Sequence, residues 1–189
     1  EGMVEGVTGQ VLRLHLDLDR LILGQTGAWD YAVPPLAKDR TVTILGLGAL
    51  GEACANALVS LNFNVVGWSR TKRDVEGVSC FAGDEDLPQA LTQAELLIHL
   101  LPETDATRNI LNSERLAQLP KGTVVLNPGR GPLIDDDALL QALDSGQVRH
   151  ATLDVFRTEP LPEDHPFWAH HSVTVTPHVA SATRPATAA

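Results

Sequence analysis

The sequence predicts an α/β protein built on a doubly wound parallel sheet. Short apolar, β-branched runs alternate with helix-compatible segments, and a cluster of glycines directly follows the first of these runs. The run at 96–101 is a continuous apolar stretch ended by a proline, which is typical of a strand buried on both faces. Strands that alternate with helices form parallel sheets with right-handed crossovers. Together these observations predict the fold class.

The expected elements follow one another from residue 41. Strands are expected at 42–45, 65–66, 78–81, 96–101, 123–126, 152–156 and 173–176, and helices at 49–61, 84–93, 113–119 and from 135 to Gly146. Ser113 is expected to cap its helix. The three aspartates at 135–137 suit the positive N-terminal end of a helix, and Gly146 stands where a helix-ending glycine belongs.

Residues 3–23 carry two apolar patterns at once. Four leucines alternate with charged residues from Leu12 to Leu18, as in a strand, whereas the apolar residues from Val4 to Leu21 keep a helical 3-4-3-4-3 spacing. Length favours a helix, because strands seldom exceed about ten residues. Leu12 and Leu16 widen the apolar face, so we expect this helix to pack against more than its own domain.

The chain is expected to divide into three parts. Residues 1–40 form a helix and a glycine- and proline-rich connector between domains or protein copies, 41–182 form a dinucleotide-binding domain, and 183–189 form a disordered tail. A length of 189 residues fits one main domain with a large core. The first Met is residue 3, after Glu1 and Gly2, which indicates a fragment or a processed chain.

Composition excludes several classes of protein. A formal net charge of −10 argues against nucleic acid or an anionic membrane as a partner, because both are bound chiefly by clustered Lys and Arg. Two cysteines, Cys54 and Cys80, are too few for a disulfide framework and fit a reducing cytoplasm. There is no apolar run of 18 residues and no basic-then-apolar leader, so neither a membrane span nor a signal peptide is expected.

The glycines after the first expected strand have the spacing G-x-G-x-x-G. They are Gly46, Gly48 and Gly51, with Ala49 and Leu50 between the last two. In a dinucleotide site, the three glycines allow a sharp turn, close approach of a pyrophosphate, and close packing of the helix on the strand. The helix then points its free N–H groups at the phosphates. Any tight strand-to-helix turn can also use glycine, but the flanking apolar strands favour the nucleotide site.

The next strand ends in a basic run, Trp68-Ser69-Arg70-Thr71-Lys72-Arg73. No Asp or Glu stands there to hold the ribose 2′-hydroxyl of NAD. Arg70 or Arg73 could instead bind a 2′-phosphate, with Ser69 or Thr71 donating hydrogen bonds. The alternative is a solvated basic turn. Because the rest of the chain is acidic, we favour NADP(H), with NAD(H) as a possible cofactor.

Three chemically distinctive residues follow expected strands: Arg130 between two glycines, Glu159 before a proline, and His178 after Thr-Pro. They suit hydride transfer between nicotinamide and a 2-oxo acid. Arg130 could bind the substrate carboxylate, His178 could give a proton to the keto oxygen, and Glu159 could set the tautomer of the imidazole. Each also has an ordinary interpretation, as a solvated arginine, a turn residue and a loop histidine. Asp154, at a strand end, could face the nicotinamide or be paired structurally.

Two other kinds of site are not supported. The histidines at 165, 170 and 171 have neither a neighbouring cysteine nor a fixed ligand spacing, so no metal is expected. No G-x-S-x-G motif and no Cys/His pairing supports a hydrolase.

In these residues and the motifs around them, the chain resembles the D-isomer-specific 2-hydroxyacid dehydrogenases, and among them the glyoxylate/hydroxypyruvate reductase A branch. The resemblance rests on Leu-Gly-Leu-Gly-Ala-Leu-Gly at 45–51, Trp-Ser-Arg at 68–70, Leu-Leu-Pro-Glu-Thr at 100–104, Asn-Pro-Gly-Arg-Gly at 127–131, Leu-Asp-Val-Phe at 153–156 with Glu-Pro-Leu-Pro at 159–162, and Thr-Pro-His-Val-Ala at 176–180. These motifs stand in family order and span most of the chain.

The resemblance implies a Rossmann-type NAD(P)-binding domain in which Arg130, Glu159 and His178 are the catalytic set. It further implies that Leu101, Pro102, Thr107, Asn127, Gly129, Asp154 and Ala180 line the cofactor site, together with the glycine turn and the basic run. The formate dehydrogenases of the superfamily have Gln where Glu159 stands, which argues against that activity. The pair Pro128-Gly129 replaces the residues more usual before the arginine.

Family members also have a substrate-binding domain that has no counterpart in this sequence. The helix expected at 4–23 resembles the helix that packs in the family's dimer, which implies a homodimer. We therefore expect the cofactor-binding domain of a cytoplasmic enzyme that reduces glyoxylate or hydroxypyruvate with NADPH, with weak turnover by this chain alone. The superfamily also contains transcriptional co-repressors, so a non-enzymatic dinucleotide sensor or assembly scaffold is the alternative.

Overall fold

The computed structural model of the chain describes residues 1–23, 27, 29, 31 and 33–182. The expected tail at 183–189 and part of the connector lie outside these residues. The described residues form a seven-stranded, wholly parallel sheet in the order β3-β2-β1-β4-β5-β6-β7. The strands are β1 Thr41–Leu45, β2 Asn64–Ser69, β3 Val78–Ala82, β4 Leu96–His99, β5 Thr123–Asn127, β6 Val148–Leu153 and β7 Val173–Val175. The predicted doubly wound sheet is confirmed.

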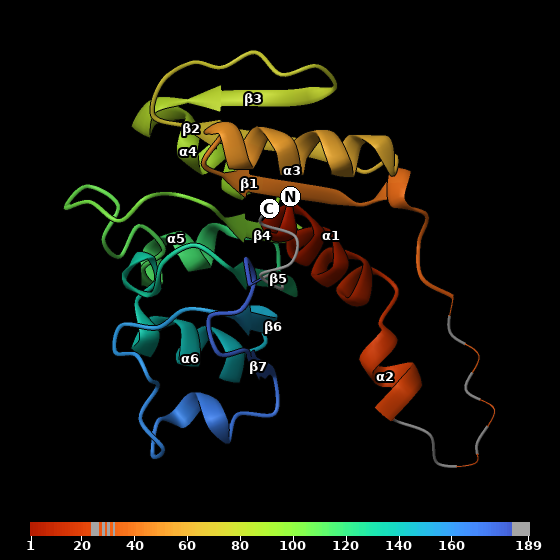
Figure 1. Cartoon of the computed structure of the whole chain (residues 1–189), viewed down its shortest axis with the longest axis vertical. Coiled ribbons are helices and arrows are strands. Elements are labelled where there is room, and N and C mark those ends of the chain that lie inside the picture. The colour runs from red at the N-terminus through yellow and green to blue at the C-terminus, as the bar shows by residue number, and fades with distance from the viewer. Residues whose placement is uncertain (24–26, 28, 30, 32, 183–189) are drawn as a thin grey trace, which may run out of the picture.

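Helices cover both faces of this sheet (Figure 1). The helices are α1 Gly2–His15, α2 Leu18–Leu23, α3 Ala49–Ser60, α4 Gly83–Leu91, α5 Ser113–Gln118 and α6 Asp136–Asp144. Alternate residues of β4 face opposite layers: Leu96 and Ile98 pack with α1 and α3, and Leu97 packs with α4, α5 and α6. Side chains alternate along a strand, so an apolar run such as this one fills both cores.

The N-terminal segment is helical, and its apolar seam faces the sheet. Val7, Val11 and Leu14 of α1 are buried in the core that the sheet shares with α3. The expected single helix over 4–23 is wrong, because the chain breaks at Asp17, whose φ of 52° is left-handed, before α2 begins. Packing of this segment against another domain or a second copy stays a prediction.

Three strands end earlier than the sequence predicts, β7 by one residue and the other two by more. β4 stops at His99 and β6 at Leu153, so 100–101 and 154–156 belong to loops at the edge of the sheet. The expected cap of α5 is also wrong: Asn112, not Ser113, is the N-cap, since its Oδ1 accepts a hydrogen bond from Arg115 N at 3.0 Å. Apolar side chains continue past the last ladder hydrogen bond in β4 and β6, which is why the pattern overestimates their length.

The end of β4 carries a buried histidine that should make folding sensitive to acid. His99 is 0% exposed, and neither ring nitrogen has a hydrogen-bond partner in the described part of the chain. Burial lowers the pKa of His99 to about 4. The unfolded chain takes up this proton near pH 6.5, so we expect the free energy of unfolding to fall by about 3 kcal/mol as the pH drops from 7 to 4.

The variant His99→Leu removes this proton uptake and should flatten the pH dependence of urea unfolding between pH 7 and 4. Burial also lowers the pKa of His150 to about 4. His150 is present in both proteins, so its effect on the pH dependence of unfolding is the same in each. His171→Gln, which replaces a histidine at an exposed position, is the matched control. If the free energy of unfolding of His99→Leu depends on pH as steeply as that of the wild type, the role given to His99 is wrong.

Candidate functional site

The turn between β1 and α3 has the close contacts that its glycines predict. Gly46 has φ 111°, and a Cβ on it would lie 2.8 Å from the carbonyl of Leu100 in the next loop. A Cβ on Gly51 would lie 1.8 Å from the carbonyl oxygen of Gly46, so this glycine lets α3 begin tightly against the turn. A Cβ on Gly48 meets nothing within 4 Å. The three glycines therefore have different functions.

This difference predicts opposite results for two alanine substitutions. Gly51→Ala forces a methyl group into backbone and should lower the free energy of unfolding by about 1–3 kcal/mol. Gly48→Ala has open space and a φ of −72°, so stability should change by less than about 1 kcal/mol. Its methyl group should instead weaken NADPH binding by obstructing the approach of the pyrophosphate. Urea unfolding and a fluorescence titration with NADPH measure the two effects; similar stability losses in both variants would disprove the distinction.

A cleft of about 390 Å³ opens beside this turn. It brings together most of the residues expected to hold the cofactor, namely Gly46, Gly48, Trp68, Ser69, Arg70, Arg73, Leu101, Pro102 and Thr107. Four others that line it were not expected: Asp84, Ala106, Ile110 and Arg115. They lie after β3 and after β4, outside the motifs on which the resemblance rests.

Two of the expected cofactor residues, Trp68 and Ser69, are also hydrogen-bonded within the protein. Trp68 is 3% exposed, and its Nε1 donates to the carbonyl of Gly83 at 2.8 Å. The Ser69 hydroxyl donates to the carbonyl of Thr71 at 2.7 Å. That hydroxyl proton therefore holds the turn, and Arg70 and Arg73 have no hydrogen-bond partner among the residues that the structure describes.

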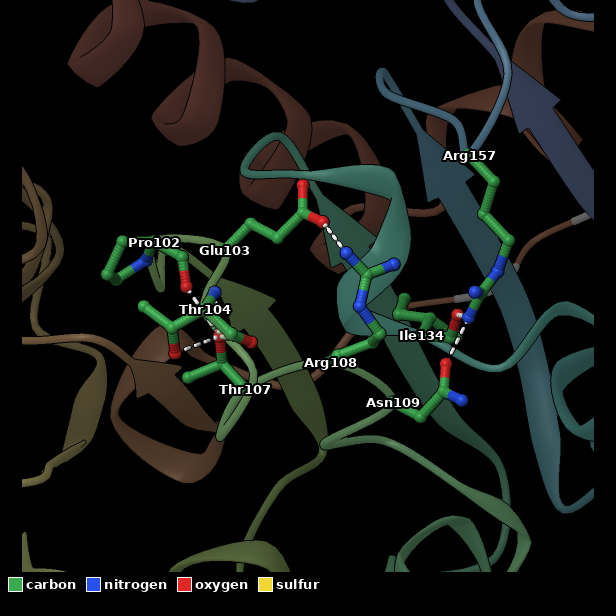
Figure 2. Close-up of polar contacts among 8 residues, drawn as sticks. All are labelled: Pro102, Glu103, Thr104, Thr107, Arg108, Asn109, Ile134 and Arg157. Carbon is green, nitrogen blue, oxygen red and sulfur yellow. Dashed lines mark hydrogen bonds and ion pairs between the residues drawn. The ribbon is translucent and has the colours of Figure 1, made fainter.

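The loop after β4 is shaped by its own hydroxyl groups, as Figure 2 shows. Thr107 Oγ1 donates to the carbonyl of Pro102 at 2.7 Å and accepts from the backbone N–H of Thr104 at 2.8 Å. Arg108 forms an ion pair with Glu103 beside it. Thr107 thus closes the turn that presents Pro102 to the cleft.

The loop after β5 carries Arg130 at its tip. Asn127, 1% exposed, donates to the carbonyl of Arg130 at 3.0 Å and accepts from the N–H of Gly129 at 3.2 Å, so its amide positions the loop. A Cβ on Gly129 would lie 2.8 Å from the carbonyl oxygen of His99, which accounts for a glycine there. Arg130 is exposed and folds back to donate to the Gly129 carbonyl at 2.7 Å.

His178 and Glu159 form a hydrogen-bonded pair. Nδ1 of His178 lies 2.8 Å from Oε2 of Glu159, and the other carboxylate oxygen accepts from Phe156 N at 2.9 Å. The hydrogen bond from His178 holds the pKa of Glu159 below its usual value, and the Phe156 N–H and the charge of Arg130 act in the same direction. Nε2 of His178 has no partner among the described residues, so it is free to meet a substrate.

Asp154 organises the loop that carries His178. Asp154 is 3% exposed. Its carboxylate accepts from Thr176 Oγ1 at 2.5 Å, Val179 N at 2.9 Å and Ala180 N at 2.8 Å, while its carbonyl accepts from His178 N at 2.9 Å. The structure therefore shows Asp154 paired with its own loop, including Ala180 N, where the chain turns at His178, whose φ is 53°. The cofactor contacts expected of Asp154 and Ala180 stay predictions.

Comparison with known proteins identifies this arrangement. Residues 10–180 match the family model described as "D-isomer specific 2-hydroxyacid dehydrogenase, NAD binding domain". The chain belongs to this dehydrogenase family. It is 44% identical over 184 residues to a glyoxylate/hydroxypyruvate reductase A from Serratia proteamaculans, covering 97% of this chain and 59% of that protein. The chain thus spans about three fifths of the length of that curated relative.

Solved structures of D-isomer specific dehydrogenases have the same fold. One from Xanthobacter autotrophicus Py2, in complex with NADPH and MES, superposes with a TM-score of 0.94 at 47% identity, over 99% of this chain and 78% of that one. An NADPH-dependent glyoxylate/hydroxypyruvate reductase from Sinorhizobium meliloti, in complex with NADP and sulfate, has a TM-score of 0.90 at 39% identity, over 96% and 59% of the two chains. The resemblance stated from the motifs is confirmed.

Two of the histidines considered for a metal site each lie near a single carboxylate. His170 lies 3.3 Å from Asp144, and His165 lies 3.9 Å from Asp136. In the part of the chain that the structure describes, no group of three or more His, Cys, Asp or Glu is arranged to hold a metal ion. Within the same residues, no helix has the length and apolar character needed to cross a membrane.

Proposed function

We propose that this chain is the NADP(H)-binding domain of a reductase that converts a small 2-oxo acid, such as glyoxylate or hydroxypyruvate, to the 2-hydroxy acid. The observation that carries the proposal is the hydrogen bond between His178 and Glu159, with Arg130 close enough for its charge to lower the pKa of the same carboxylate. The names of the Serratia and Sinorhizobium relatives support the substrate class. The presence of Arg130, Glu159 and His178 together favours an enzyme over a non-enzymatic dinucleotide sensor or assembly scaffold.

The described residues fit a dinucleotide. The N-cap of α3 is Gly48, which supplies no side-chain cap, and Ala49 and Leu50 are not buried. The N–H groups of Ala49, Leu50 and Gly51 precede the first intrahelical hydrogen bond, from Glu52 to Gly48, and are therefore available to phosphate oxygens. Arg70 and Arg73 line the same cleft and suit a 2′-phosphate. These features favour NADP(H) over NAD(H).

The three side chains divide the work of reduction. The bound cofactor supplies the hydride. Arg130 holds the substrate carboxylate and polarises the keto oxygen with its positive charge. Nε2 of His178 gives a proton to that oxygen as it gains negative charge, and Glu159, bonded to Nδ1, stabilises the imidazolium form that carries the proton.

A mostly apolar cleft of about 560 Å³ lies beside this pair, lined by Phe156, Leu161, Trp168 and Val175 among others. His178 and Glu159 have side chains 47% and 36% exposed, so in this chain the reacting groups face water on this side. Exclusion of water strengthens electrostatic catalysis. We therefore infer that the chain alone turns over slowly and that a substrate domain completes the site.

We also propose that the protein is a cytoplasmic homodimer that pairs through its N-terminal region. Large apolar side chains are exposed on α2 and the segment after it, with Ile22 60%, Trp29 95%, Tyr31 82% and Val33 71% exposed. A second copy that covers these side chains would remove this apolar surface from water.

The test is NADPH oxidation with glyoxylate, followed by absorbance. It compares this chain with a longer form in which the substrate domain of the Serratia reductase is joined to it. We expect the longer form to consume NADPH in proportion to glyoxylate and the chain alone to do so weakly. Binding of NADPH without oxidation by the longer form, when the intact Serratia reductase is active in the same assay, would refute the proposal.

A further inference from the structure

The loop after β6 contains an arginine to which the proposed mechanism gives no role. Arg157 lies between Asp154, which holds the His178 loop, and Glu159, which bonds His178 itself. Its side chain points toward Asn109 and Ile134, in the loops that follow β4 and β5 (Figure 2). It is 33% exposed and does not line the cofactor cleft. The contacts of its guanidinium are therefore with other residues of the protein and not with the cofactor cleft.

The guanidinium joins both neighbouring loops. Nη2 of Arg157 donates to Oδ1 of Asn109, in the loop after β4, and to the carbonyl oxygen of Ile134, in the loop after β5 (Figure 2). Nε lies 3.5 Å from Oδ1 of Asp136, at the start of α6. Asn109 has φ 51°, a left-handed conformation that asparagine tolerates better than most residues. One planar side chain thus contacts three acceptors: one in the loop after β4, one in the loop after β5 and one at the start of α6.

The backbones of these loops are in direct contact around the guanidinium. Asn109 N donates to the carbonyl of Pro132 at 2.9 Å, and Leu111 forms a parallel bridge with Ile134. A Cβ on Gly131 would lie 2.0 Å from the carbonyl carbon of Phe156, so no side chain separates the loop of Arg130 from the loop of Glu159. The loops after β4, β5 and β6 are therefore packed against one another where the guanidinium binds the first two.

We propose that Arg157 is a positioning residue that sets the placement of Arg130 relative to the Glu159–His178 pair by joining the loops after β4, β5 and β6. This inference rests on the proposed reductase function. Hydride transfer needs the carboxylate-binding arginine and the proton donor at one spacing, and a misplacement of about 1 Å can cost about 100-fold in rate. Lysine cannot replace this arginine, because an ammonium lacks the planar fork that reaches several acceptors.

The first measurement needs no activity. Hydrogen exchange by mass spectrometry compares the chain with Arg157→Lys, which keeps the charge but not the fork. We expect faster exchange in 107–112 and 131–135, where the N–H groups of Asn109, Leu111 and Asp135 bond across the loops. Arg149→Lys, an exposed arginine at the other end of β6, is the control and should leave these segments unchanged. Faster exchange confined to 154–159 would overturn the proposal.

The second measurement uses the longer form that carries a substrate domain. Arg157→Lys and Arg157→Ala should lower kcat by about tenfold or more while the Kd of NADPH stays within about threefold. Added guanidinium should partly restore kcat in Arg157→Ala. Unchanged kcat, or a loss that guanidinium does not restore, would overturn the positioning role. If the wild-type longer form is inactive, the reductase proposal fails, and the exchange measurement still decides whether Arg157 joins the loops.

Discussion

His178→Ala is expected to lower kcat for glyoxylate reduction by about 10²–10⁴-fold in the longer form that carries a substrate domain. The reason is the geometry of the imidazole: Glu159 occupies Nδ1 at 2.8 Å, and Nε2 has no partner among the described residues. Without this side chain, no comparable acid faces the keto oxygen. Stopped-flow measurement of NADPH oxidation at saturating substrate gives kcat directly.

Two controls distinguish loss of the proton donor from disruption of the folded loop. The backbone N–H of His178, not its ring, bonds to Asp154, so the alanine variant should keep the loop and bind NADPH as the wild type does. His171→Gln, an exposed histidine outside the loop, should leave kcat unchanged. Wild-type activity in His178→Ala would remove this residue from the mechanism.

The double variant Arg70→Ala with Arg73→Ala is expected to weaken NADPH binding by about 100-fold. Two charge-assisted hydrogen bonds to a 2′-phosphate, each contributing about 1.5 kcal/mol, account for this factor. Affinity for NADH should change little, because it has no 2′-phosphate. Fluorescence titration of this chain with both cofactors measures the change.

Lys72→Ala is the matched control, since Lys72 lies between the two arginines in the sequence but does not line the cleft. It should reduce NADPH affinity far less than the double variant. Equal affinities of the unaltered chain for NADPH and NADH would contradict the assignment of the 2′-phosphate site, as would equal losses in the control and the double variant.

The order of strands and helices was predictable because burial leaves a strong pattern. Strands covered on both faces need apolar side chains at successive positions, and residues 96–98 and 124–126 have them. The strand ends were less predictable. Leu101 and Val155 are as apolar as strand residues, but they lie in loops beyond the ends of β4 and β6. The sequence pattern records burial, whereas the end of a strand depends on pairing with its neighbours.

The candidate site was predictable in its chemical groups and less so in its contacts. Arg130, Glu159 and His178 stood out because arginine between glycines and histidine after Thr-Pro are unusual at strand ends. Nothing in the sequence distinguished an Asp154 that faces a cofactor from one that holds a loop, since the same residue serves both purposes. Ser69 and Asn127 were likewise expected to bind the cofactor, and in the structure they also hold turns.

By itself, the sequence determined the alternating architecture, the glycine turn for a dinucleotide and the three residue types suited to hydride transfer, because each depends on local spacing or side-chain chemistry. Only the tertiary structure decided the partners of the polar groups. Asp154 bonds to the His178 loop and Arg157 bonds to two neighbouring loops, whereas His99 has no partner among the described residues. Such pairings join residues up to 48 positions apart. They arise because parallel strands bring the loops at their carboxyl ends together, which local sequence patterns do not reveal.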